Sequence, residues 1–83
     1  MSIRDERLRM EAKLADLRHQ RDTAEMRARG QRTLIRMETD LSVSDLTKLK
    51  VDMISLASLD LEKTVLGMRS LDEQIRAIEE ELS

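Results

Sequence analysis

The chain is divided by the stretch Leu41-Ser42-Val43-Ser44-Asp45-Leu46, which has the pattern of a helix N-terminus. With Ser42 as N-cap, Asp45 falls three residues later, at the position of the acidic residue in a capping box. Leu41, one residue before the cap, can then pack against Leu46 as a hydrophobic staple. The stretch therefore predicts that a second helix begins near residue 43.

The residues before this stretch suit the end of a first helix. Thr39 and Asp40 are poor helix-interior residues, because their side chains compete for backbone hydrogen bonds. We therefore expect a single domain over residues 1–83, with a helix at about 2–38, a turn at about 39–42 and a helix at about 43–82. Neither Pro nor Gly lies at the turn, so one continuous helix is the alternative. The equal helix lengths favour an all-α, coiled-coil-like antiparallel hairpin.

Both predicted helices carry apolar residues at alternating spacings of three and four, the pattern of a coiled-coil seam. In the first helix the seam is interrupted by Arg7, Arg21 and Gln31, and its apolar members are Ile3, Met10, Leu14, Leu17, Ala24, Ala28 and Ile35. In the second helix it consists of Ile54, Ala57, Leu61, Thr64, Met68, Leu71, Ile75, Ile78 and Leu82. Antiparallel pairing of the seams also places Arg4, Arg7 and Arg9 beside Glu79, Glu80 and Glu81.

Two glycines interrupt the helical pattern. Gly67 lies within unbroken heptads, so we expect the second helix to continue through it. Gly30 follows Arg27-Ala28-Arg29, which resembles a helix C-terminus with cations in its last turn. Gly30 is therefore the better candidate for a kink.

The first helix has a second apolar stripe roughly opposite its seam, which consists of Met1, Leu8, Ala12, Ala15, Met26, Leu34 and Met37. A lone hairpin would leave this stripe in water, although burying one large aliphatic side chain is worth about 1.5–3 kcal/mol. We therefore expect self-association, most simply a dimeric four-helix bundle. The expected oligomer-interface residues are Leu8, Met10, Leu14, Leu17, Met26, Ile35, Met37, Ile54, Leu61, Met68, Leu71, Ile75 and Ile78.

A further set of leucines in the second helix lies off its seam. Leu59 and Leu66 are seven residues apart and therefore share one helix face, with Leu56 at its edge. A contiguous apolar strip on a helix surface is typical of an interface with another protein. We assign Leu56, Leu59 and Leu66 to the binding of a protein partner.

An arginine-rich helix face gives an alternative function. Arg29, Arg32 and Arg36 share one face of the first helix, and Lys48 lies near the same end of the hairpin. Such a face could follow the phosphates of RNA or DNA. The net charge of −2 and the absence of aromatic residues for base stacking count against it. We therefore expect nucleic-acid binding to be less favoured than protein binding.

The amino-acid composition argues against most kinds of catalytic and metal-binding site. The 83 residues contain no Phe, Tyr, Trp, Pro or Cys and a single histidine, which leaves too few ligands for a structural zinc site. Acidic residues at exposed helix positions lack the desolvated cleft that catalytic carboxylates need. We expect no enzymatic activity, no cofactor and no small-molecule substrate.

The sequence also lacks signals for a membrane or for secretion. No apolar run approaches the roughly 20 residues that span a bilayer. The N-terminus MSIRDERLRM carries charges where a signal peptide needs an apolar core. We therefore expect a soluble protein in the cytoplasm, where the lack of cysteine also fits.

Together these patterns predict a non-enzymatic helical protein–protein interaction module that self-associates and binds a protein partner through an apolar helix face. An adaptor, a chaperone-like protein or an inhibitory regulatory protein would all use such surfaces. One alternative is a nucleic-acid-binding four-helix bundle that uses the arginine-rich face. A second alternative is a structural subunit of a larger helical assembly, such as a secretion or phage apparatus.

Overall fold

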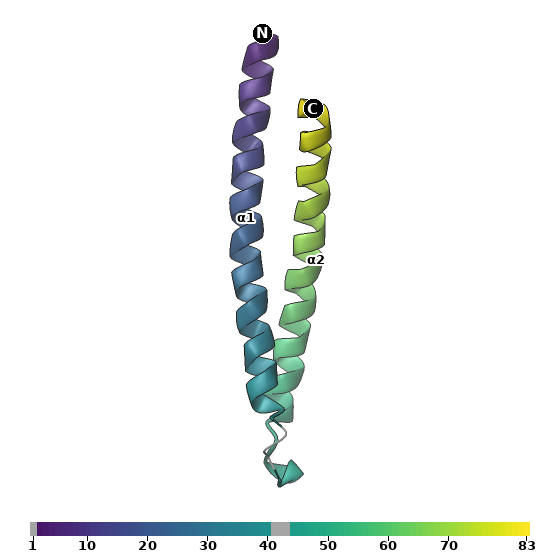
Figure 1. Cartoon of the computed structure of the whole chain (residues 1–83). Coiled ribbons are helices and arrows are strands. Elements are labelled where there is room, and N and C mark those ends of the chain that lie inside the picture. Colours follow the sequence, from purple (N-terminus) through teal and green to yellow (C-terminus); the bar gives the residue numbers. More distant parts are fainter. Residues whose placement is uncertain (1, 41–43) are drawn as a thin grey trace.

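The computed structural model describes residues 2–40 and 44–83. Within these residues it contains two α-helices, α1 (Ile3–Glu38) and α2 (Val51–Leu82), a short 3₁₀ helix η1 (Leu46–Lys48) and no strand. Figure 1 shows α1 and α2 running in opposite directions, with the two chain ends at the same end of the molecule. The expected all-α helical hairpin is therefore confirmed.

Local hydrogen bonds set both ends of α1. The side chain of Ser2 accepts a hydrogen bond of 3.2 Å from the backbone N–H of Asp5, which caps the first turn. At the other end the hydroxyl of Thr39 donates to the carbonyl of Ile35 over 2.6 Å, and its backbone N–H does so over 3.0 Å. The helix therefore ends at Glu38, as the sequence predicted.

The start of the second helix was predicted wrongly: α2 begins at Val51 and not near residue 43. Asp45 caps η1, because its carboxylate accepts hydrogen bonds from both the backbone N–H and the hydroxyl of Thr47. Such local bonds offer the backbone an alternative to the α-helix. The predicted capping role of Ser42 and the staple formed by Leu41 fall outside the described residues.

The hairpin is long and thin. Its extents are 66 × 16 × 15 Å, and α1 extends past the end of α2 at the open end (Figure 1). Arg7 lies beside this end and donates a hydrogen bond of 3.4 Å to the carbonyl of Leu82, but its ion pair, at 3.3 Å, is with Glu11 of the same helix. Glu79, however, pairs with Arg18 over 3.0 Å and not with an arginine of the first turns.

Neither glycine interrupts its helix. Gly30 lies within α1 and Gly67 within α2, and neither has a positive φ angle. The helix is therefore continuous at Gly30, the position that the sequence offered as a candidate for a kink. A Cβ atom added at either position would have no neighbouring atom within 4 Å, so these glycines do not serve close packing within the hairpin.

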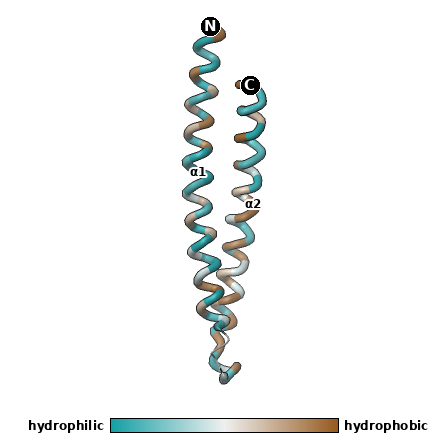
Figure 2. The backbone as a smooth tube through the Cα atoms, viewed as in Figure 1, coloured by the Kyte–Doolittle hydropathy of each residue, from teal (hydrophilic) through white to brown (hydrophobic). Residues whose placement is uncertain are grey.

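The core of the hairpin is small. Only Leu14, Leu17 and Ala57 are buried among the described residues, with exposed fractions of 7%, 5% and 5%. The other seam residues from Met10 to Ile35 and from Ile54 to Leu82 are half-buried, so the two predicted seams do face each other. Figure 2 shows that the apolar residues of α2 gather in its half nearer the connection.

Candidate protein-interaction surfaces

The hairpin exposes more surface than a chain of its mass needs. A compact monomer of 9.6 kDa is expected to have an accessible surface of about 5,100 Å². The hairpin exposes 6827 Å². The excess is roughly 1,700 Å², and a standard protein–protein interface covers about 800 Å² on each partner. The single hairpin therefore has enough uncovered area for a stable interface.

Three leucines form the most regular exposed apolar feature, and we call them the α2 strip. Leu56, Leu59 and Leu66 are 62%, 54% and 53% exposed. They are offset by about half a helix turn from seam residues such as Leu61, so they lie on the side of α2 that faces away from α1. The structure thus places the three predicted partner-binding residues together on one outward face, available for contact.

The exposed apolar residues of α1 are more dispersed. Leu8, Met26, Leu34 and Met37 are all exposed. Leu34 and Met37 are three residues apart, whereas Leu8 lies 18 residues before Met26. The remaining residues that were assigned to the oligomer interface already pack, fully or partly, within the hairpin: Met10, Leu14, Leu17, Ile35, Ile54, Leu61, Met68, Leu71, Ile75 and Ile78. The described residues of the second stripe of α1 are therefore exposed as expected.

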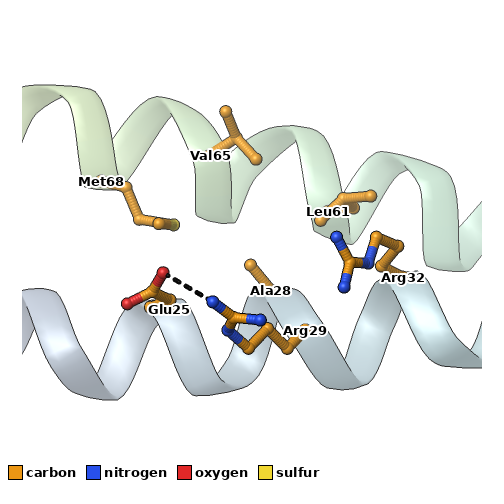
Figure 3. A pocket seen from close by; sticks show the side chains of 7 residues that line it. All are labelled: Glu25, Ala28, Arg29, Arg32, Leu61, Val65 and Met68. Carbon is orange, nitrogen blue, oxygen red and sulfur yellow. Dashed lines mark hydrogen bonds and ion pairs between the residues drawn. The ribbon is translucent and has the colours of Figure 1, made fainter.

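A shallow apolar groove runs between the helices, and we call it the Ala28 groove (Figure 3). Figure 3 shows the small side chain of Ala28 facing Leu61 and Met68 of α2. The hollow measures about 290 Å³, and Arg29 and Arg32 lie on its α1 side. The sequence signal for this groove is Ala28, a small residue at a seam position where larger residues occur elsewhere.

The arginines of the alternative nucleic-acid site share one side of α1. Arg29 pairs with Glu25 over 3.2 Å within the same helix. Arg32 and Arg36 are exposed and make no ion pair within residues 2–40 and 44–83. Lys48 lies in η1, outside both long helices. The structure therefore brings the three arginines together on α1 and leaves Lys48 on a separate element.

One half-buried ion pair connects the two helices. Arg21 of α1 donates a hydrogen bond of 2.7 Å to Asp72 of α2 and lies 3.7 Å from Glu25. The hydrogen bond to Asp72 raises the pKa of Arg21 above its ordinary value, against the opposing effect of burial. This arrangement is a fixed structural contact with both charges matched, and it leaves neither group poised for proton transfer.

The seam also contains a polar atom that lacks a partner. The side-chain oxygen of Gln31 is buried and accepts no hydrogen bond from any described residue. Leaving a buried polar group unpaired costs about 1–3 kcal/mol. Gln31 therefore weakens the hairpin at this point of the seam.

No protein-family model, curated protein or solved structure matches this chain. Neither α1 nor α2 combines the length and the apolar content that a bilayer crossing requires, over the part of the chain that the structure describes. No group of three or more His, Cys, Asp or Glu side chains suited to a metal ion occurs among these residues either.

Proposed function

We propose that this chain is a non-enzymatic helical protein–protein interaction module that self-associates and binds protein through exposed apolar helix faces. The observation that carries the proposal is the α2 strip. Three leucines at helical spacing on one outward face are exposed by more than half, and the hairpin itself offers nothing to cover them. Contiguous exposed apolar patches of this kind mark interaction sites in soluble proteins.

Self-association is the first part of this function. The thin core, with three buried residues in the described part of the chain, and the surplus surface both support a dimeric four-helix bundle, in which two hairpins cover each other's apolar faces. In the assembled form the module would act as an adaptor, a chaperone-like protein or an inhibitory regulator. The proposal places it in the cytoplasm, on the strength of its cysteine-free sequence.

The function is tested by changing the α2 strip and measuring every protein it binds. Leu59→Glu with Leu66→Glu introduces two negative charges on the strip, and Ser58→Glu with Ser83→Glu introduces the same charge on another side of α2. The tagged proteins are isolated from the native host, and bound proteins are quantified by mass spectrometry beside the oligomer mass. The leucine variant should lose self-association or a bound protein, whereas the control variant keeps both. A leucine variant that retains all of the wild-type binding would overturn the proposal.

Nucleic-acid binding is a second candidate, because Arg32 and Arg36 are exposed without an ion pair among the described residues. Its test is a gel shift with single-stranded RNA and with duplex DNA at physiological salt. We expect no shift. A shift that falls steeply with salt and disappears in Arg29→Gln, Arg32→Gln, Arg36→Gln would favour this candidate over protein binding.

The mass of the particles in solution distinguishes a structural subunit of a larger helical assembly from a closed dimer. Such a subunit would form species well above a dimer at micromolar concentration, and their mass would rise as concentration rises. A closed dimer of this module would keep a constant mass over the same range.

A further inference from the structure

The outward face of α2 extends beyond the three leucines of the strip. Positions that alternate at spacings of three and four along α2 share this face. They are all exposed, and in chain order they are Asp52, Leu56, Leu59, Lys63, Leu66, Ser70 and Glu73. The face thus has an apolar middle with Lys63 inside it and an acidic residue near each end.

The charges on this face argue against a parallel pairing with the same face of another copy. In a parallel, in-register pair each residue lies opposite itself. Asp52 would then face Asp52, Lys63 would face Lys63 and Glu73 would face Glu73. Like charges placed directly opposite one another destabilise a helix pair, so this orientation is disfavoured at three positions.

An antiparallel pairing removes all three conflicts. We place the twofold axis beside residue 61, midway between Leu56 and Leu66. Leu56 of one copy then lies opposite Leu66 of the other. Glu73 then lies opposite the N-terminal end of the other α2, close to Lys50. The N-terminus of a helix carries a partial positive charge, so this end attracts Glu73.

The same register also matches the remaining charges. Asp52 lies opposite Ser70 of the second copy, next to Arg69. Lys63 lies opposite Leu59 of the second copy, and the next residue of that copy is the acidic Asp60. Each charged residue of the face is therefore near an opposite charge, while Leu56 of one copy packs against Leu66 of the other on both sides of the axis.

We propose that the outward face of α2 binds a second copy of this chain in an antiparallel, twofold-symmetric pair centred beside residue 61. This inference rests on the proposed self-association and names its surface and orientation. It reassigns Leu56, Leu59 and Leu66 from another protein to the homodimer. The exposed side chains of α1, Leu8, Met26 and Met37, then remain available to a different protein.

The orientation can be measured with spin labels, because the chain has no native cysteine. Single variants Lys63→Cys, Ser70→Cys and Ser83→Cys are labelled, and the distance between the two labels of each oligomer is determined by electron paramagnetic resonance. The axial separation grows by about 3 Å for each residue from the axis, twice the helix rise. We therefore expect the Lys63 labels to lie close together, with separations of about 27 Å at position 70 and about 66 Å at position 83.

Each other result has a defined meaning. Short distances at all three positions show a parallel pair, and a long distance at position 63 shows that another face forms the dimer. Either result overturns this inference and leaves the proposed function in place. A monomeric wild type contradicts both.

A matched pair of variants checks the surface independently of the labels. Leu59→Glu with Leu66→Glu should weaken the dimer at least about 100-fold in sedimentation, because four leucines lose their burial. Ser58→Glu with Ser83→Glu adds the same charge at exposed positions off this face and should leave the dimer affinity within a few-fold of wild type. A dimer that is equally stable in both variants contradicts the inference.

Discussion

The guanidinium of Arg21 in α1 donates a hydrogen bond to the carboxylate of Asp72 in α2, and the two atoms lie 2.7 Å apart. Arg21 occupies a seam position, where a coiled coil normally has an apolar residue. Its side chain is only 26% exposed, whereas both side chains of the other inter-helix pair, Arg18 and Glu79, are about half exposed. The Arg21–Asp72 pair therefore fixes one point of α1 against one point of α2, and the contact helps to define the register of the hairpin.

A double-mutant cycle should show that this inner pair is the stronger of the two. Using Arg21→Met and Asp72→Asn, we expect a coupling of about 0.5–1 kcal/mol in urea unfolding, the upper part of the range for partly exposed pairs. The matched cycle, Arg18→Met with Glu79→Gln, should give a smaller coupling because Arg18 is more exposed to water than Arg21, while the two carboxylates are about equally exposed. A larger coupling free energy for Arg18–Glu79 would show that the burial of an ion pair does not determine its strength in this hairpin.

Replacing either glycine by alanine should stabilise the hairpin. Gly30 and Gly67 have helical backbones, and a Cβ added at either position meets no atom within 4 Å. Each change should raise the free energy of unfolding by about 1 kcal/mol, because alanine has the higher helix propensity. The measurement is urea unfolding of the two single variants and of the double variant. A loss of stability at either site would mean that a second chain packs against that glycine.

The buried leucines of α1 and the exposed leucines of α2 should respond differently to the same substitution. Leu14→Asp or Leu17→Asp places a charge in the buried seam and should unfold the chain, because an unpaired buried charge is very costly. Leu59→Asp should keep the helical circular dichroism signal, since the side chain is 54% exposed. A folded Leu14→Asp variant would show that the seam is not the core.

The turn should titrate through Asp45. The hydrogen bonds from the hydroxyl and the backbone N–H of Thr47 lower the pKa of Asp45 below its ordinary value. A lowered pKa means that Asp45 stabilises the turn above its ordinary pKa, and the contribution disappears as the pH falls through the lowered value. Thr47→Val should raise the pKa of Asp45 toward the ordinary value, as measured by NMR of the carboxyl carbon. Thr64→Val, in the middle of α2, is the control and should leave it unchanged.

The sequence predicts the helices of this protein better than it predicts their connection. Apolar periodicity over more than thirty residues defines the seams, and residues such as Leu14, Leu17 and Ala57 are buried as expected. The start of α2 depends on a local competition that the pattern does not decide. Asp45 bonds to Thr47, and the residue before α2, Lys50, makes no side-chain capping bond that could mark its start.

The interaction surfaces were predictable only in part. Exposure of Leu56, Leu59 and Leu66 follows from their spacing relative to the seam, so their shared outward face could be derived from the sequence. The pairing of Arg21 with Asp72 depends on the register between the helices, which the length of the connection alters. A longer connection, with α2 beginning at Val51, changes which residues of the two helices lie side by side, and the sequence pattern did not predict that start.

The mass of the wild-type protein in solution tests the central claim most directly. Light scattering on chromatographed protein at micromolar concentration should give at least twice the 9.6 kDa of one chain, because the single hairpin leaves the α2 strip and roughly 1,700 Å² of surplus surface uncovered. A fully helical, cooperatively unfolding protein with a mass of 9.6 kDa under these conditions would contradict it.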